Sequence, residues 1–94
     1  MIVCLSQMTA KKGKESLLEK ALRALIPPTL KEPGCLAYEL WKDLHNKQSF
    51  VVYERFKDQE ALKKHIEMSY VRDFMESAYT TCVESHWDLN LSIL

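Results

Sequence analysis

One histidine is the residue of this sequence best suited to proton transfer. His65 follows Leu62 by three positions and precedes Ile66, in a segment whose apolar residues recur at helical spacing. A neutral imidazole in the wall of a pocket accepts or donates a proton near neutral pH. The same placement also fits a hydrogen-bonded core histidine, and the sequence leaves both interpretations open.

Glu54 is the second candidate, because it follows the apolar run at residues 50–53 in a predicted strand. If its side chain points toward the helices, its carboxylate orients the imidazole of His65, as a third group orients the base in nucleophilic sites. The alternative is an edge carboxylate paired with Arg55 or a lysine. A slip of one residue would turn Glu54 to the other sheet face, so the phase of this strand decides its role.

A set of aromatic and amide side chains forms the candidate lining of a substrate pocket. Aromatic walls suit a flat, hydrophobic ligand whose orientation is fixed by hydroxyl groups, although the same residues also suit core packing. Gln7 is either a hydrogen-bond donor to a ligand carbonyl or a solvated residue at a strand end. The candidate substrate-binding residues are Gln7, Tyr38, Trp41, Tyr53, Phe56, Tyr70 and Phe74.

Several other chemistries lack the residues that they require. The sequence has only 2 glycines, no HExxH motif, no carboxylate cluster at metal-ligand spacing and no serine nucleophile elbow. We therefore expect neither a metal nor a tightly bound organic cofactor. The three cysteines are widely spaced and form no CxxC pair, so they are interpreted as buried thiols.

The charge balance and hydropathy limit the partners. Thirteen basic residues balance 13 acidic ones, which does not favour nucleic-acid binding or a polybasic membrane anchor. The apolar run at residues 2–5 is too short for a signal peptide or a membrane span. We therefore expect a cytoplasmic protein without membrane or nucleic-acid partners.

The candidate residues lie on elements whose order predicts the fold. Apolar runs and alternation predict strands at residues 2–9, 35–41, 49–56 and 86–94. Apolar residues at helical spacing predict a helix from Glu15 to a proline break near Ile26, and helical segments from the N-cap Asp58 to Cys82. The order β-α-β-β-α-β is the ferredoxin-like arrangement, an α+β fold with helices on one face of a four-stranded antiparallel sheet. The 94 residues, 1–94, form one such domain.

The strands carry apolar side chains in both phases, such as Cys4 beside Leu5. A monomer with helices on one sheet face needs only one apolar phase. The alternation of residues 87–93 further predicts a half-buried last strand. A second copy of the chain is the economical cover for the free face, so we expect a homodimer through the sheet.

Three segments resemble the antibiotic biosynthesis monooxygenase family. They are KxGKE after the first strand, LKEPGCLAYEL through the turn and second strand, and FVVYERFKDQEALKKH through the third strand and its helix. The combination EPGCLxY and YExFKDxxALxxH is the most specific part. The resemblance implies a ferredoxin-like homodimer known as a dimeric α/β barrel. It places Glu54 in the YE element, His65 in ALxxH, and Phe56 where many members have Trp.

The family resemblance implies a cofactor-independent monooxygenase that oxidises a small quinol-like or anthrone-like aromatic with dioxygen. In this interpretation His65 is the base and Glu54 supports it. Many members have a second His where this chain has Tyr70. The alternatives are a non-catalytic, ligand-sensing dimer and an isomerase of a small carbonyl or phosphorylated signalling molecule. A phosphorylated substrate requires a pocket cation, for which Arg55 and Arg72 are the candidates.

Overall fold

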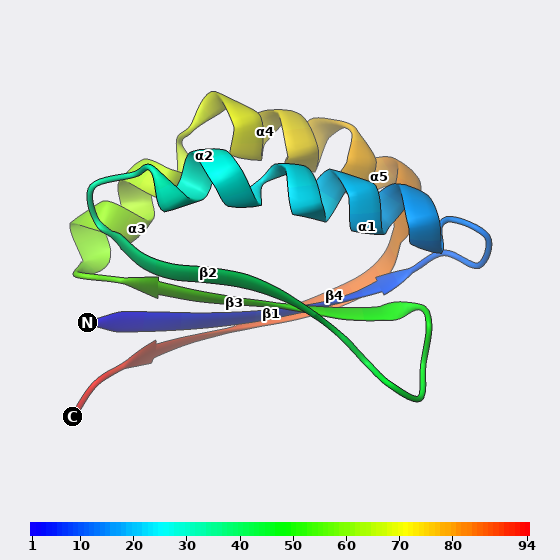
Figure 1. Cartoon of the computed structure of the whole chain (residues 1–94), viewed down its shortest axis with the longest axis horizontal. Coiled ribbons are helices and arrows are strands. Elements are labelled where there is room, and N and C mark those ends of the chain that lie inside the picture. The colour runs from blue at the N-terminus through cyan, green and yellow to red at the C-terminus, as the bar shows by residue number, and fades with distance from the viewer.

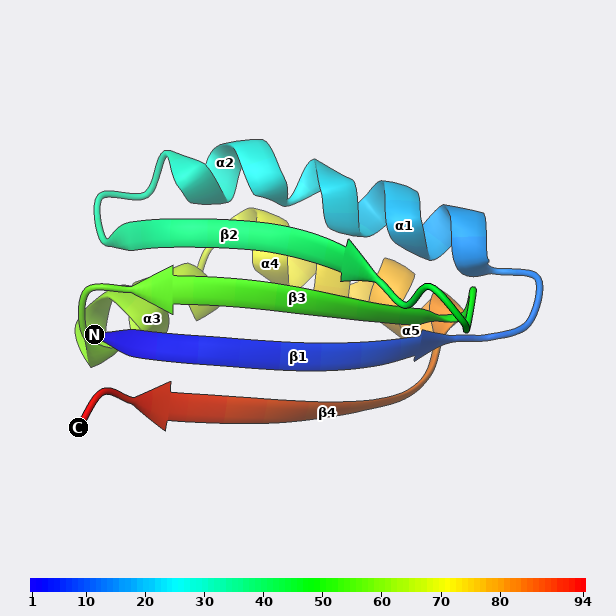
Figure 2. The same cartoon turned by 60° about the horizontal axis from the view of Figure 1, so that its bottom comes forward.

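Four strands form one open antiparallel sheet, and all the helices lie on one of its faces (Figure 1). In the computed structural model, which describes all 94 residues, the elements are β1 (Ile2–Ala10), α1 (Glu15–Ala24), α2 (Ile26–Leu30), β2 (Cys35–Lys42), β3 (Ser49–Phe56), α3 (Gln59–Ile66), α4 (Ser69–Glu76), α5 (Ala78–Cys82) and β4 (Val83–Ser92). The strand order β2-β3-β1-β4 confirms the predicted ferredoxin-like fold. The sheet does not close, and β2 and β4 are its edges (Figure 2).

The phase of β1 assigns the two faces of the sheet. Cys4 and Met8 are buried toward the helices, whereas Val3 and Leu5 alternate with them on the open face. Glu54 pairs with Cys4 across the β1–β3 ladder, so it shares the helix-covered face. The register therefore settles the phase of Glu54, which the sequence alone leaves open.

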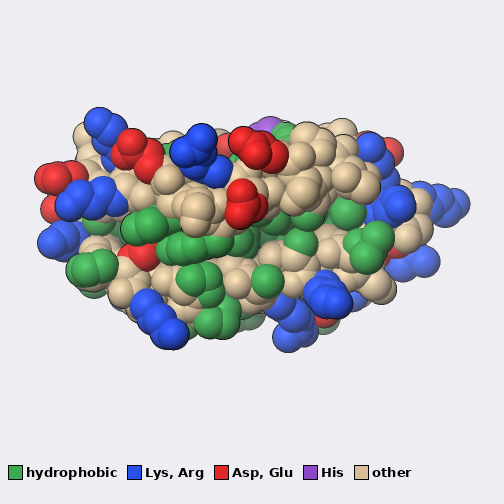
Figure 3. Space-filling view, turned by 90° about the horizontal axis from the view of Figure 1, so that it is seen from above, with side chains coloured by type: hydrophobic (Ala, Val, Ile, Leu, Met, Phe, Trp, Pro, Cys, Tyr) green, Lys and Arg blue, Asp and Glu red, His purple; other side chains and the backbone are tan.

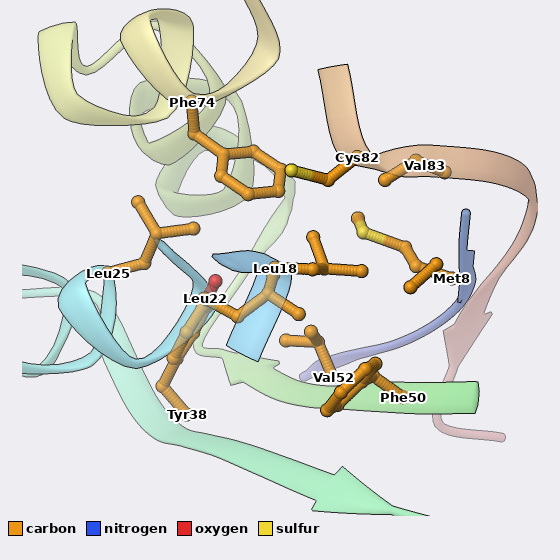
Figure 4. Packing of buried hydrophobic residues seen from close by; sticks show 11 residues of the cluster. Met8, Leu18, Leu22, Leu25, Tyr38, Phe50, Val52, Phe74, Cys82 and Val83 are labelled. Carbon is orange, nitrogen blue, oxygen red and sulfur yellow. The ribbon is translucent and has the colours of Figure 1, made fainter. Parts of the chain in front are cut away.

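The main core lies between the sheet and the helices. Leu18 and Leu22 of α1 are almost completely buried and pack over Phe50 and Val52 of β3, with Phe74 of α4 closing the other side (Figure 4). The helical face has a band of hydrophobic side chains along its middle, flanked by charged residues (Figure 3). None of the helices is long and apolar enough to cross a membrane.

The helical segments start and stop close to the predicted positions, with one difference. Asp58 is the N-cap of α3, and its carboxylate accepts a hydrogen bond from the backbone N–H of Ala61 at 2.8 Å, as predicted. The first helix, α1, ends at Ala24, close to the predicted break near Ile26, but the proline pair at residues 27–28 does not end the helical region. It lies in the first turn of the short helix α2, where a proline removes no intrahelical hydrogen bond.

The last strand differs from the prediction in the face that its apolar residues occupy. Trp87, Leu89 and Leu91 are 45–49% exposed, because they pair with Gln7, Leu5 and Val3 of the open face. The prediction of a half-buried β4 is therefore wrong for the single chain. The polar phase of β4 is the one that faces the helices.

Candidate active site

A cavity of about 280 Å³ lies between the sheet and the helices. This volume is at the lower end of the roughly 300–1,000 Å³ of ligand sites, so it suits a small ligand. Most of the lining is apolar, with Met8, Val52 and Phe74 among the wall residues. The polar lining residues include Ser6, Tyr38, Glu54, His65, Tyr79, His86, Asp88 and Asn90.

His65 is held between two buried carboxylates. Its Nδ1 lies 2.8 Å from Oε2 of Glu32, and its Nε2 lies 3.4 Å from Oε1 of Glu54. The rings of Phe56 and Tyr38 flank the imidazole, with centroid distances of 5.1 and 5.6 Å. These contacts fix the ring, and His65 is only 4% exposed. Glu54 therefore lies beside His65, which is the arrangement expected if its side chain points toward the helices.

Local chain geometry brings these side chains together. Helix α3 begins directly after β3, so Glu54 and His65 lie on adjoining elements. Gly34, in the turn directly before β2, allows α3 to approach closely, because a Cβ there would lie 2.3 Å from the Cβ of Ala61. Glu32 precedes this glycine in the turn after α2, where its backbone N–H donates to the carbonyl of Thr29 at 3.0 Å.

The electrostatics of the cavity favour a carboxyl group that changes charge near neutral pH. Burial, and after it the negative charges of Asp88 and Glu32, together raise the pKa of Glu54 to about 7. Burial, and after it the charges of Glu54 and Asp88, also raise the pKa of the Cys4 thiol to about 11. Cys4 therefore remains a neutral thiol in the cavity wall.

Two tyrosines next to the site stay protonated for related reasons. The hydroxyl of Tyr70 donates a hydrogen bond to Oε2 of Glu32. Burial, and then this hydrogen bond to Glu32, raises the pKa of Tyr70 to about 12. Burial raises the pKa of Tyr38 well above its usual range, with a smaller contribution from the charge of Glu54. Both hydroxyls are therefore hydrogen-bond donors at neutral pH.

The sheet register divides the predicted site residues into two groups. Glu54, His65, Tyr38 and Phe74 line the cavity, Phe56 packs against the His65 ring, and Tyr70 reaches the site through Glu32. Gln7, Trp41 and Tyr53 lie on the opposite, open face of the sheet, so they do not line the cavity as expected.

The phase of the strands explains why Gln7, Trp41 and Tyr53 do not line the cavity. Gln7 pairs with Val51, and Val51 pairs with Trp41, which puts both predicted residues in the outward phase of their strands. Tyr53 pairs with Leu5 of the same phase. The amide of Gln7 donates to the hydroxyls of Thr9 and Ser49 at 2.9 and 3.0 Å rather than to the cavity.

Sequence reasoning missed Glu32 and the polar phase of β4. Glu32 stands in a Lys-Glu-Pro-Gly turn, which usually indicates a solvated loop. His86, Asp88 and Asn90 occupy alternate positions of one strand, so they share a face. That alternation is the sequence signal for the side of β4 that faces the helices, but the large apolar residues between these positions favour the opposite assignment.

Residues 1–77 match the family of antibiotic biosynthesis monooxygenases. The chain belongs to this family. A Shewanella oneidensis protein of solved structure is 30% identical, with a TM-score of 0.93 over 96% of this chain and 87% of that chain. A Pseudomonas aeruginosa protein is 29% identical, with a TM-score of 0.92 over 99% of this chain and 93% of that chain. The resemblance stated from the sequence motifs is therefore confirmed.

An uncharacterized Synechocystis protein is 27% identical over 77 residues, which are 82% of this chain and 52% of that protein. This chain thus spans about half the length of the curated relative that it matches. Glu32, Glu54 and His65 fall inside the residues that match the family, whereas β4 lies beyond them. The family match therefore includes the side of the cavity formed around His65 but not the side formed by β4.

Proposed function

We propose that this family member is a cofactor-independent monooxygenase that oxidises a small, electron-rich phenol or quinol with dioxygen. The observation that carries the proposal is His65, held between Glu32 and Glu54 in the wall of a largely apolar cavity. This arrangement supplies a base with a fixed orientation. The apolar walls suit a flat aromatic ring and limit the access of water to it.

The reaction requires one proton acceptor and one oxygen molecule. The pair Glu54 and His65 takes the hydroxyl proton of the phenol, and the resulting anion gives one electron to dioxygen. The phenoxyl radical and superoxide then combine at a ring carbon that bears hydrogen, which forms a carbon–oxygen bond and a peroxide. The peroxide regains the proton held by the pair. Loss of the ring hydrogen and cleavage of the O–O bond then release water and leave a carbonyl on the ring.

Glu32 and Glu54 have different parts in this proton transfer. Glu32 accepts the hydrogen bond of Nδ1–H, which directs the lone pair of Nε2 toward Glu54 and the cavity. Glu54 accepts the substrate proton when it is ionised and shares it with Nε2. Because the pKa of Glu54 is about 7, the carboxyl group both takes up and returns a proton near neutral pH.

The composition of the lining does not favour a phosphorylated substrate for this chain. No Lys or Arg is among the residues that line the cavity. Of the two candidates, Arg55 lies in the outward phase of β3 and Arg72 is exposed on α4. An isomerase of a phosphorylated molecule is therefore the weaker alternative, and a ligand-sensing protein that uses the same cavity is the stronger one.

An oxygen-electrode screen of hydroquinones, anthrones and naphthols tests the proposal. We expect oxygen uptake with the wild-type protein and a loss of roughly 10²–10⁴-fold in turnover for His65→Ala, since one general base is removed. His45→Ala is the matched control, because His45 lies in the exposed β2–β3 loop. Near-normal uptake by a folded His65→Ala protein excludes His65 as the base, and no uptake with any substrate favours the ligand-sensing alternative.

We further propose that two copies of the chain associate through their open sheet faces. Apolar side chains of β1 and β4, including Leu5, Leu89 and Leu91, lie together on this face. Nε of Arg55, on the same face, is buried and has no hydrogen-bond partner within the chain. A second copy supplies apolar cover and an acceptor together.

A further inference from the structure

We propose that His86, positioned by Tyr79, is a second ligand-binding group that contacts an oxygen at the far end of the substrate. This inference rests on the proposed function, because it assigns an aromatic ligand to the same cavity. It adds a specificity: rings with oxygens at both ends bind more tightly than rings with one. The acting residues come from α5 and β4, not from the His65 cluster.

The first observation is the fixed orientation of the His86 ring. The hydroxyl of Tyr79 and Nδ1 of His86 form a hydrogen bond. The two rings meet edge to face, with centroids 5.1 Å apart and planes at 77°. Both side chains line the cavity. Because the neighbouring helix already holds the ring in one orientation, ligand binding does not have to fix this side chain and costs less conformational entropy.

The second observation is that Nε2 of His86 is free for a ligand. Oδ2 of Asp88 lies 3.8 Å from Nε2, which is beyond hydrogen-bonding distance. The one hydrogen bond of this ring uses Nδ1. When the Tyr79 hydroxyl donates to Nδ1, the neutral imidazole carries its proton on Nε2. That N–H is then a donor for a hydroxyl or carbonyl oxygen of the ligand.

The third observation is the distance between the two polar ends. Glu54 pairs with Cys4 on one side of β1, and His86 pairs with Met8 on the other. Their backbones are therefore about 10 Å apart across the strands and about 14 Å apart along them. Met8, Val52 and Phe74 line the apolar wall of the same cavity. A ligand that reaches both ends needs two polar groups separated by a flat apolar body.

The fourth observation concerns the family match. Tyr79 and His86 lie beyond the matched residues 1–77, whereas Glu54 and His65 lie within them. The proton-transfer end of the cavity is thus the part covered by the family. The other end of the cavity lies outside the residues that match the family model, although β4 belongs to the fold shared with solved structures that cover 96–99% of this chain.

Ligand binding without oxygen tests the inference separately from turnover. Calorimetry under anaerobic conditions compares 2,6-dihydroxynaphthalene, with oxygens at both ends of its long axis, against 2-naphthol, which lacks one of them. We expect the wild-type protein to bind the diol roughly 2- to 10-fold more tightly, as one additional hydrogen bond implies. In His86→Ala the two affinities should become equal within about twofold, with that for 2-naphthol unchanged.

Two further variants separate binding from general damage. Tyr79→Phe keeps the imidazole but removes the hydroxyl that orients it, so the preference for the diol should fall partway. His45→Ala, an exposed loop histidine, should keep the full preference. The inference is overturned if the folded His86→Ala protein keeps the preference, if it loses affinity equally for both ligands, or if the wild-type protein shows no preference.

The same set of proteins distinguishes this inference from the proposed function. If the diol preference depends on His86 but no oxygen is consumed in air, the oxygenase proposal fails and the second binding group stands. If oxygen uptake depends on His65 but His86→Ala keeps the diol preference, the binding group fails and the oxygenase proposal stands.

Discussion

Both ring nitrogens of His65 face carboxylates that are themselves almost fully buried. Removing a charge from water is costly, so two acidic groups around one imidazole require compensation. For Glu32, the hydrogen bonds from His65 and Tyr70 compensate for the loss of water. Glu54 has a raised pKa instead, so it holds a proton through much of the acidic range. The two carboxylates therefore differ in how they are stabilised although they contact the same ring.

Replacing Glu32 tests its role in holding the imidazole. Glu32→Gln keeps the shape and an acceptor for Nδ1–H but removes the charge that stabilises the protonated ring. We expect kcat to fall roughly 10-fold or more, with little change in KM, because the cavity lining is unaffected. The matched control is Glu60→Gln, a glutamate of α3 that is 76% exposed and paired with Lys64. Equal kcat values for the two variants contradict the role.

The pKa of Glu54 predicts how stability depends on pH. The folded-state pKa is about 7, above the ordinary value of 4.5 for a glutamate, so the unfolded chain releases this proton at a lower pH than the folded chain. The free energy of unfolding therefore decreases as pH rises from about 4.5 to about 7, and it then levels off. Burial and the negative charges of Asp88 and Glu32 oppose the ionisation of the Glu54 carboxyl group. His65 faces this carboxyl group as its partner.

Glu54→Gln should remove this dependence. The difference compared is the free energy of unfolding of the variant minus that of the wild-type protein. We expect this difference to be larger at pH 8 than at pH 5, since glutamine carries no charge to desolvate. Thermal unfolding of both proteins at several pH values measures the difference. A stability difference that stays constant from pH 5 to pH 8 contradicts a raised pKa. In activity, the wild-type rate should rise with pH through about 7, because the pair of Glu54 and His65 accepts the substrate proton only when the carboxyl group of Glu54 is ionised.

At the scale of the elements, the positions of strands and helices were predictable because periodicity and capping are local signals. Asp58 and the change of period after it located α3, and with it His65. Which side chains of each strand point toward the helices was not predictable in the same way. Both phases of β1 and β3 are apolar, and in β4 the polar phase faces the helices. Pairing register is a tertiary property, so Gln7, Trp41 and Tyr53 were assigned to the wrong face.

The helix α3 packs closely against the turn before β2 because Gly34 has only a hydrogen atom in place of a side chain. In Gly34→Ala the new Cβ would lie 2.3 Å from the Cβ of Ala61, so α3 must shift away. We expect a loss of roughly 1–3 kcal/mol in the free energy of unfolding, as in overpacked cores. Because His65 lies one turn after Ala61 on the same helix, turnover should fall as well.

A double-mutant cycle identifies the clash as the cause. Ala61→Gly removes the opposing methyl group, so Gly34→Ala should cost much less stability in that background than in the wild-type protein. Thermal unfolding of the two single variants and the double variant gives the coupling. Purely additive losses would show that the cost of Gly34→Ala arises from backbone conformation and not from contact between the two elements.

At the scale of the whole molecule, the fold covers only one face of its sheet (Figure 1). The open face has large apolar side chains, with Trp41 60% exposed and Trp87 49% exposed. Monomeric proteins rarely expose contiguous apolar patches of this kind. The cavity lies on the other side of the sheet, so association through the open face leaves the candidate active site accessible to its ligand.

Association through the open face predicts a particle of twice the mass of one chain. Light scattering at micromolar concentration should give about two times 11.0 kDa for the wild-type protein. Leu89→Lys should shift the mass toward that of one chain, because each dimer would bury two ammonium groups without partners. Leu44→Lys, at a loop residue that is 93% exposed, is the matched control and should remain dimeric. A wild-type mass of one chain, or a Leu89→Lys protein that stays dimeric, would show that this face is not the interface.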